Sequence, residues 1–498
     1  MKDIKFVGLH AHSGVGSPFD GFGYPADHMD FCYENGGQAL ALTDHGNMNG
    51  FAYQVLHAKK MKSLGKDFKA IFGVEAYFIN DVAEWRTQYE EHKADKKKAK
   101  ELSTKQSGVN VEEEGATKSK GRSINRSRHL VLLAMNQTGL NNIFNMISES
   151  YSEKYFYRKP RMDYSLLAKY SDGVIAMSAC LGGVYAGCYW ENIEDGEEAV
   201  LECMRETTRT MVGIFGDRWY GELQWNAVPE QHALNKYIIK MHEEFGIPLV
   251  STADSHYPTP TDRELYKRLG WLGRGAPEWL DMTLPGAVSD MDYELYPKNG
   301  DQMWDDYLKY SKGYEYEDEL ILRSIEQSHN IAFDRIEQFL PDTTVRLPDF
   351  VVPAGRDEDD YLRDLSLGGL KLLSKHNSEY TSRLNHELKV IADRGFSKYF
   401  LTMKAISDKT NEVQIAGPGR GSAAGSLVAY ALGITQVDPI QYGLLFSRFL
   451  RSDATDYPDI DYDVSDPMVL KDMLIEEWGD DVVVPISNWN TLQLRSLL

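Results

Sequence analysis

Two short stretches in the last part of the sequence combine residue types that could bind a nucleotide and a metal ion. The first is the glycine-rich run GPGRGSAAG at residues 417–425, which carries one guanidinium and one hydroxyl ahead of an apolar run. Backbone N–H groups in such a turn, at the start of a helix, suit phosphate. The second is YPDIDYD at residues 457–463. We predict a strand here, which would place Asp459, Asp461 and Asp463 on one face, where they could hold hard cations through oxygen.

A second set of metal-ligating residue types is spread over the first half of the sequence. His10 and His12 form a His-x-His pair, which puts both imidazoles on one face of a strand. Further candidates follow strand-like runs: Asp20, His45, Glu75, His129, Cys180, Asp254 and His256. A single histidine at a strand end is usually only a hydrogen-bonding residue, so the prediction depends on recurrence. Mixed imidazole and carboxylate ligands suit zinc, manganese or iron, and clustered divalent metals activate water against phosphate esters.

The elements that must position these residues read as strands and helices in alternation. Strand-like runs such as Phe6–Leu9 favour an α/β domain over residues 1–265. Within it, residues 81–128 are densely charged or poor in apolar residues, which predicts a solvated insertion. We predict a connector and the start of the next domain over residues 266–355. Residues 356–498 carry the glycine loop and the carboxylate run.

Length and composition exclude several classes of protein. A chain of 498 residues predicts two or three domains. Its net charge of −21 excludes a protein that coats nucleic acid through bulk positive potential. Its four cysteines lack zinc-site spacing among themselves, which predicts a reducing compartment and no disulfide framework. No start resembles a signal peptide and no run approaches the roughly 20 apolar residues of a membrane span, so we predict a cytoplasmic protein without a membrane partner.

The motifs resemble those of bacterial replicative DNA polymerases. Four of them resemble the polymerase and histidinol phosphatase (PHP) domain of the C-family DNA polymerase III alpha subunit: LHAH at 9–12, LTDHGN at 42–47, GVEAY at 73–77 and ADSHY at 253–257. Three resemble the palm of the same enzymes: residues 417–425, LFSRFL at 445–450 and PDIDYD at 458–463. The resemblance is collinear over nearly the whole chain. It implies a PHP-type (β/α) barrel-like metal domain followed by the N-terminal part of a polymerase beta-like palm.

The resemblance implies roles for the residues of the palm motifs. Asp459 and Asp461 match two carboxylates that hold Mg²⁺ during DNA synthesis from primer-template DNA and dNTPs, and Asp463 is a weaker catalytic candidate. The residues that match the triphosphate-contacting loop are Gly419, Arg420, Gly421 and Ser422. Arg448 matches an arginine that neutralises triphosphate charge. Its alternative reading is a surface ion pair.

The resemblance also assigns the metal ligands of the PHP domain. The family's nine metal positions fall on His10, His12, Asp20, His45, Glu75, His129, Cys180, Asp254 and His256. All nine hold ligand-capable residues, which implies binding of Zn²⁺ or Mn²⁺ and a 3′→5′ exonuclease. A purely structural metal site is the alternative, because both roles need the same ligands and differ in substrate access.

The sequence departs from the family in lacking its third catalytic aspartate, which in the family lies downstream in a motif like KMDFLG. Counterparts of the fingers and of the clamp-binding region are also missing. We therefore predict one half of a split polymerase, such as a phage might encode, in the bacterial cytoplasm. A second polypeptide would complete it and carry any contact with the sliding clamp.

Three alternatives stay open at this point. The chain could be a truncated product, a stand-alone PHP metal-dependent phosphoesterase with an inert palm, or a non-catalytic scaffold. Because phosphate contacts dominate DNA affinity, the negative net charge predicts weak DNA binding by this chain alone.

Overall fold

The chain forms two compact units in the computed structural model, Met1–Asp342 and Thr343–Leu498. We call them the first and the second unit and describe each by itself. The structure describes residues 4–106, 127–273, 293–341, 344, 346, 349–453, 457–480 and 482–484.

The first unit is built on a curled sheet of seven strands. They are β1 (Ala39–Leu42), β2 (Lys69–Phe78), β3 (Arg128–Ala134), β4 (Arg161–Met162), β5 (Val174–Met177), β6 (Trp219–Gln224) and β7 (Leu249–Thr252). The order is β1-β2-β3-β5-β6-β7, with β4 beside β2. Pairing is parallel except on the two sides of β3. Nearly every strand residue is buried, as expected for a sheet covered on both faces.

The segment before β1 joins the two edges of this sheet. Gly8 bridges Leu40 of β1, and Ala11 bridges Ser255, which follows β7. The predicted strand at Phe6–Leu9 is therefore present only as isolated bridges, but it curls the sheet toward a barrel. This arrangement confirms the predicted barrel-like α/β fold.

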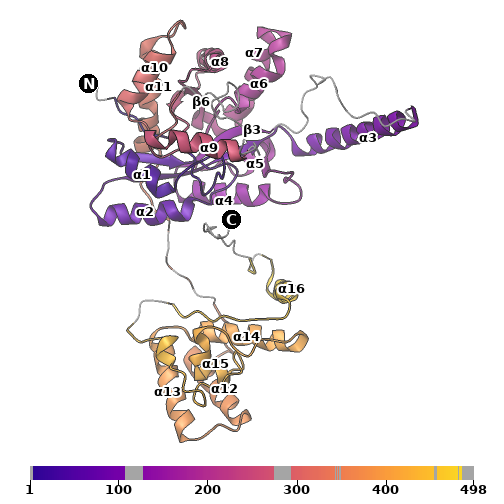
Figure 1. The fold of residues 1–498 in the computed structure, drawn as a ribbon, viewed down its shortest axis with the longest axis vertical. Coiled ribbons are helices and arrows are strands. Elements are labelled where there is room, and N and C mark those ends of the chain that lie inside the picture. Colours follow the sequence, from indigo (N-terminus) through magenta and orange to yellow (C-terminus); the bar gives the residue numbers. More distant parts are fainter. Residues whose placement is uncertain are drawn as a thin grey trace. The chain divides into compact units, whose positions relative to one another are not determined.

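Helices of the first unit lie around the sheet (Figure 1). They are α1 (Pro25–Glu34), α2 (Phe51–Ser63), α3 (Val82–Gln106), α4 (Gln137–Ser150), α5 (Tyr164–Lys169), α6 (Val184–Asn192), α7 (Glu197–Phe215), α8 (Pro229–Phe245), α9 (Arg263–Gly273), α10 (Gly300–Tyr310) and α11 (Asp318–Asn330). Helix α11 packs on β7, where Ser324 Oγ lies 2.7 Å from Ser251 Oγ. The charged stretch predicted as a solvated insertion forms α3, and the part of it at residues 107–126 lies outside the described residues.

One prediction about the cysteines is wrong. Cys188 of α6 and Cys203 of α7 form a disulfide. This pairing has no local sequence signal, because the two thiols meet only when α6 and α7 pack against each other. Cys32 is free and buried, and Cys180 is free and partly buried.

The second unit is helical in its described part. Its helices are α12 (Glu358–Leu372), α13 (Ser378–Asp393), α14 (Ser397–Val413), α15 (Leu427–Ala431) and α16 (Pro467–Trp478). The apolar run after the glycine loop is buried in its core, at Leu427, Val428 and Leu432. In neither unit does the described part of the chain contain a helix long and apolar enough to cross a membrane.

The predicted carboxylate strand is not formed as a sheet strand. In the described part of the second unit, backbone pairing of this run is limited to a bridge between Ala416 and Val464, flanked by Gly417 N–H donating to Asp463 O over 2.8 Å. The alternation of burial nevertheless persists. Pro458 and Ile460 are buried, whereas all three aspartates are exposed.

Candidate metal centre and carboxylate–loop site

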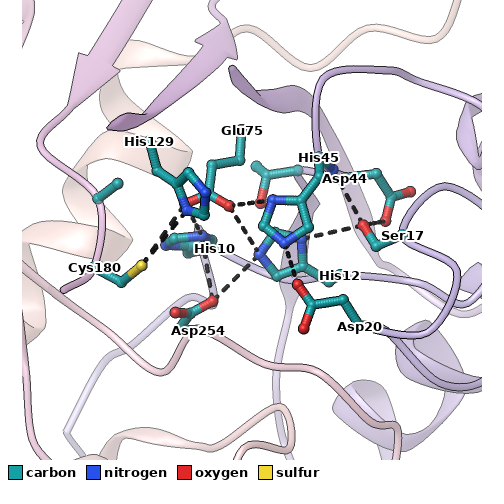
Figure 2. Close-up of polar contacts among 12 residues, drawn as sticks. His10, His12, Ser17, Asp20, Asp44, His45, Glu75, His129, Cys180 and Asp254 are labelled. Atoms are coloured by element: carbon teal, nitrogen blue, oxygen red, sulfur yellow. Dashed lines mark hydrogen bonds and ion pairs between the residues drawn. The ribbon is translucent and has the colours of Figure 1, made fainter. Parts of the chain in front are cut away.

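The nine candidate ligands of the first unit come from loops at one end of the sheet and from β2 and β3, and the structure brings them together (Figure 2). His10 and His12 lie on the segment that joins the sheet edges, and His45 follows β1. Cys180 comes after β5. Asp254 and His256 come after β7. Parallel strands deliver the residues that follow them to the same edge, which is why positions far apart in sequence converge here.

Glu75 lies at the centre of this cluster. Its Oε1 is 3.3 Å from His10 Nε2 and 3.1 Å from His129 Nδ1. Its Oε2 is 2.7 Å from His45 Nδ1 and 3.5 Å from His12 Nε2. The two carboxylate oxygens thus face different pairs of imidazoles, which is the arrangement needed for a carboxylate that bridges two cations.

The other ligands surround this centre. Asp254 Oδ1 lies 3.3 Å from both His10 Nε2 and His12 Nε2. Asp20 Oδ2 lies 2.6 Å from His45 Nε2 and its Oδ1 lies 4.0 Å from His256 Nε2. On the other side, Cys180 Sγ lies 3.8 Å from His129 Nδ1 and 4.0 Å from Glu75 Oε1. We name these nine residues the metal centre.

Five buried ligand atoms of the metal centre face one another at 2.7–3.5 Å, yet none of them makes a well-directed hydrogen bond to a described residue. They are His10 Nε2, His12 Nε2, His45 Nδ1, Glu75 Oε2 and Asp254 Oδ1. Buried polar atoms are almost always satisfied, so five such atoms in one place need an explanation. Their groups form three overlapping sets in which the ligand atoms lie within 4.8 Å of one another: His12 with His45 and His256, His10 with His12 and Glu75, and His45 with Glu75 and His129. The donor set fits divalent cations that take nitrogen and oxygen ligands.

The electrostatics of the metal centre favour positive charge. Burial opposes protonation of His45, but Glu75 and Asp20 outweigh it and raise its pKa to about 10. Burial and the neighbouring His45 lower the pKa of His12 to about 3, so this imidazole is a neutral ligand. Despite burial, His129, His45 and His10 hold the pKa of Glu75 well below its ordinary value. Against the effect of burial, nearby carboxylates also raise the pKa of His10. A site that keeps buried carboxylates ionised and draws protons onto the imidazoles of His45 and His10 favours the binding of a cation.

Sequence reasoning missed the residues that orient the ligands. Glu222 of β6 is fully buried, and its Oε1 lies 2.7 Å from His10 Nδ1. Ser17 Oγ lies 3.4 Å from His12 Nδ1 and donates to Asp44 Oδ1 over 2.9 Å. Such partners leave the opposite ring nitrogen free to face the metal. A charged residue inside an apolar strand, as at Glu222, was the available signal.

The backbone is strained at two points of the metal centre. Asp254 has φ of 47° and Ala179, just before Cys180, has φ of 61°. These are left-handed conformations that residues other than glycine adopt at a cost, and they concentrate at functional sites. Here they turn the ligands that follow β5 and β7 toward Glu75.

In the second unit, the glycine loop lies against the carboxylate run. A Cβ atom built on Gly421, where φ is 63°, would lie 2.1 Å from Asp461 Oδ2. Arg420 Nη1 lies 3.0 Å from Asp463 Oδ1, and both side chains are exposed. The left-handed φ favours glycine at 421, and an added Cβ would push the Asp461 carboxylate from its place beside the loop. Gly419, with φ of 150°, and Ser422 complete the loop around this contact.

The expected use of a helix N-terminus for phosphate is wrong for this loop. Helix α15 is separated from it by the short 3₁₀ turn Ser422–Gly425. The first N–H groups of α15 are already taken, because Val428 N–H donates to Glu387 Oε2 over 3.1 Å and Ala429 N–H donates to Ser426 Oγ over 3.2 Å. Any anion held here must be held by the loop itself.

The remaining candidates of the second unit are exposed and separate. Arg448 ends the 3₁₀ turn Phe446–Arg448 and makes no ion pair with any described residue. Among the residues that the structure describes, sets of three metal-ligating groups occur in the metal centre and not around Asp459 and Asp461. The structure therefore brings Asp461 and Asp463 to the loop but forms no three-ligand site there.

Comparison with known proteins first defines the classes of domain. Residues 8–226 match the PHP domain, and residues 360–498 match the bacterial DNA polymerase III alpha NTPase domain. The first unit is thus a curled, barrel-like PHP domain, and the second is the helical region that matches the NTPase domain.

Relatives of the chain then define the family. DNA polymerase III subunit alpha of Aquifex aeolicus is 33% identical over 504 residues, which cover 99% of this chain and 39% of that protein. The alpha subunits of Borreliella burgdorferi and Thermus aquaticus are each 30% identical, over 99% of this chain and 38% and 41% of their own length. The chain belongs to the DNA polymerase III alpha family and corresponds to its N-terminal part. It spans about two fifths of the length of these relatives.

The similarity of this chain to solved structures is weaker than its similarity to these relatives. An amidohydrolase from Chromobacterium violaceum is 12% identical, with a TM-score of 0.26, over 51% of this chain and 88% of its own. This likeness carries no functional argument.

Proposed function

We propose that this chain takes part in template-directed DNA synthesis and contributes the nucleotide-binding part of a polymerase site. The observation that carries the proposal is the close approach of the glycine loop to Asp461 at residue 421, where a left-handed φ of 63° favours glycine. Asp459 and Asp461 would hold Mg²⁺, whose charge assists phosphoryl transfer. Arg420 and Ser422 would bind the triphosphate of the incoming dNTP.

Arg448 and Asp463 have lesser roles in this proposal. Arg448 is exposed and unpaired within the described chain, so its guanidinium is available to neutralise triphosphate charge. Asp463 is paired with Arg420. It would support the loop and serve as a catalytic carboxylate only if that pair opens.

We propose that DNA synthesis needs further parts of a full-length alpha subunit, beyond the part that this chain matches. The chain matches about two fifths of its relatives, and the remaining part of the family's length, on a second polypeptide or on the same one, would supply the grip on primer-template DNA. Contact with a sliding clamp would come through that remaining part.

For the first unit we propose a metal-dependent 3′→5′ exonuclease, a phosphodiester-cleaving activity on DNA ends. The carrying observation is the convergence of five buried ligand atoms that lie 2.7–3.5 Å from one another but make no well-directed hydrogen bond among the described residues. Zn²⁺ or Mn²⁺ bound here would lower the pKa of water and neutralise phosphate charge. In this chain, Glu75 and Asp254 provide the negative charge, and Glu222 and Ser17 hold the imidazoles in the orientation that binding requires.

A reciprocal experiment tests both proposals. Single-nucleotide primer extension and 3′-end degradation are measured with Mg²⁺ or Mn²⁺, with and without a polypeptide carrying the rest of a relative's length. Asp461→Ala should abolish extension and spare degradation, and His12→Ala should do the reverse. Asp472→Ala, which removes an exposed carboxylate of α16, should change neither.

The outcomes separate the alternatives. Degradation without extension under any condition would favour a stand-alone phosphoesterase. If neither activity appears while the metal centre is loaded, both catalytic proposals fail, and a scaffold with a structural metal remains.

A further inference from the structure

The loop that precedes β4 concentrates exposed aromatic and basic side chains beside the metal centre. Residues 154–161 read KYFYRKPR, with four cations, three aromatic residues and no acidic residue in a chain whose net charge is −21. We call residues 155–160 the aromatic–basic loop. Neither the proposed catalytic roles nor the metal centre accounts for it.

The aromatic–basic loop is held in a defined conformation. Tyr157 N–H donates to Lys159 O over 3.2 Å across a tight turn in which Arg158 adopts a left-handed φ of 58°. Beyond the turn, Arg161 is 3% exposed, and its guanidinium lies 3.6 Å from the centre of the Trp85 ring. Pro160 packs on Gly46, where an added Cβ would meet its ring at 2.9 Å. A turn fixed in this way presents its side chains at little entropic cost on binding.

One side of the loop faces the metal centre. Lys159 Nζ lies 4.0 Å from the centre of the Tyr77 ring. The same ring is stacked on His45 at 5.9 Å and contacts His129 at 5.5 Å. Partial burial lowers the pKa of Lys159, while the carboxylates of Asp20 and Glu75 act in the opposite direction, so its ammonium lies within the field of the metal centre. A single tyrosine ring therefore separates this cation from two of the candidate ligands.

The other side of the loop offers a stacking surface. Tyr151 is 50% exposed and Phe156 is 42% exposed, and their rings are stacked at 5.8 Å with an interplanar angle of 24°. Large exposed rings beside unpaired cations are the combination that binds single-stranded nucleic acid, since bases stack on the rings and phosphates meet the cations. Arg158 and Lys159 form no ion pair with any residue in the described part of the chain.

Acidic groups around this surface are few. Glu149 is paired with Lys169 at 2.5 Å, and Glu153 is exposed. Two carboxylates of the metal centre, Asp20 and Glu75, act on the Lys159 ammonium through their charge. Charge complementarity thus favours a polyanion lying over the loop and ending at the metal centre.

We propose that the aromatic–basic loop and Tyr151 bind the 3′-terminal nucleotides of a single DNA strand, with Tyr151 and Phe156 against bases and Arg158 and Lys159 against phosphates. This inference rests on the proposed exonuclease function and names its substrate: a single-stranded end rather than a small phosphomonoester. Lys159, beside Tyr77, holds the phosphate nearest the metal centre. These are positioning residues and make no contribution to metal binding.

Direct binding tests the inference independently of catalysis. The full chain is titrated into a fluorescent oligothymidylate whose 3′-terminal linkages are phosphorothioates, and anisotropy is followed over a range of salt concentrations. Arg158→Gln and Lys159→Gln should each lower the slope of log K against log salt by about 0.7, the value for one phosphate contact on a single strand. Lys312→Gln removes an exposed cation elsewhere and should leave the slope unchanged.

The aromatic pair gives a second readout. Tyr151→Leu and Phe156→Leu together should weaken binding at least about fivefold, and Tyr151→Phe, which keeps the ring, should not. A 3′-terminal 4-thiothymidine should crosslink to the peptide containing residues 151–160. Zinc or manganese content and hydrolysis of bis(p-nitrophenyl) phosphate, a small phosphodiester, should remain within about twofold of wild type, because none of these residues is a metal ligand.

The possible failures are distinguishable. If wild type hydrolyses no phosphate ester but the loop variants weaken strand binding, the exonuclease proposal fails and the strand-binding surface stands. If degradation occurs while the loop variants bind and degrade the oligonucleotide as wild type does, or if the crosslink falls only on other peptides, the inference is overturned. Equal weakening by Lys312→Gln would overturn it as well.

Discussion

Replacing Glu222 by glutamine removes one charge from beneath the metal centre without changing the volume of the side chain. Glu222 Oε1 accepts hydrogen bonds from Thr252 Oγ1 over 2.5 Å and Gln224 Nε2 over 3.2 Å, and it lies 2.7 Å from His10 Nδ1. Oε2 accepts one from Ala179 N–H over 3.1 Å. In this arrangement the neighbours donate to the carboxylate. A glutamine must either point its NH₂ group at the Ala179 N–H or turn it toward the Thr252 hydroxyl and the His10 ring, which would then have to accept instead of donate.

The magnitude follows from these contacts. An unsatisfied buried donor costs about 1–3 kcal/mol, so we expect the metal-free Glu222→Gln protein to lose about that much free energy of unfolding. The loss of the carboxylate also frees the His10 ring and lowers its basicity. Mutation of a residue that hydrogen-bonds to a metal ligand typically lowers metal affinity about 10–100-fold. Since His10 contributes one of several ligands, we expect the metal centre to weaken but persist.

Two measurements check this expectation. Zn²⁺ and Mn²⁺ affinities are measured by competition with a fluorescent chelator, and the stability of the chelator-treated protein is measured by urea unfolding of the first unit. Glu202→Gln is the control, because Glu202 is an exposed residue of α7 whose partners are Arg205 and Arg209. A change in metal affinity of less than about threefold for Glu222→Gln, with unfolding unchanged, would refute the argument that Glu222 orients His10.

Three further expectations concern other parts of the chain. Gly421→Ala should reduce primer extension, measured with the rest of a relative's length added, at least about tenfold and leave metal content unchanged. The reason is that alanine adopts the left-handed φ of 63° at a cost and its Cβ would lie 2.1 Å from Asp461 Oδ2. Extension at the wild-type rate would contradict this. Unfolded without reductant, the chain should titrate with two thiols by Ellman's reagent and with four after reduction, because Cys188 and Cys203 are paired; four thiols at the start would show the pair to be reduced. Burial raises the pKa of Glu387 above its ordinary 4.5, so the folded state binds this proton more tightly than the unfolded state does. The free energy of unfolding of the second unit should therefore fall as pH rises above about 4.5. Glu387→Gln should flatten this pH dependence in urea unfolding, and an unchanged dependence would count against it.

Much of the metal centre could be predicted from the sequence because its signals are local. His10 and His12 share a face through the His-x-His spacing, and His45 follows an apolar run that forms a strand. At Glu222 the local signal is only a charged residue inside an apolar strand, which does not say what it contacts. Its position beneath His10 depends on the pairing of β5, β6 and β7, which joins residues far apart in the sequence. The disulfide between α6 and α7 could not be predicted for the same reason, since it depends on how two helices pack.

The glycine loop shows a different limit. Its composition correctly indicates a turn, whereas the positive φ of residue 421 and its close approach to Asp461 are seen only in the structure. The expected helix N-terminus is occupied, however, by Glu387 of α13, which Arg383 Nε contacts at 2.5 Å and which accepts from Val428 N–H. Sequence reasoning about a phosphate loop identifies available N–H groups from local pattern alone. It cannot show when a distant buried carboxylate has already taken them.

The carboxylate run keeps its alternation although it forms no sheet strand, and this decides how its three aspartates can be used. Burial of Pro458 and Ile460, rather than a ladder of hydrogen bonds, turns the aspartates to solvent. Asp463 is then drawn to Arg420, 3.0 Å away. Arg420 cannot hold Asp463 and a triphosphate with the same donors, so binding of a nucleotide by Arg420 must weaken or open that pair. Asp459 and Asp461, which have no such partner among the described residues, are therefore the carboxylates that a metal ion can recruit without breaking an existing contact.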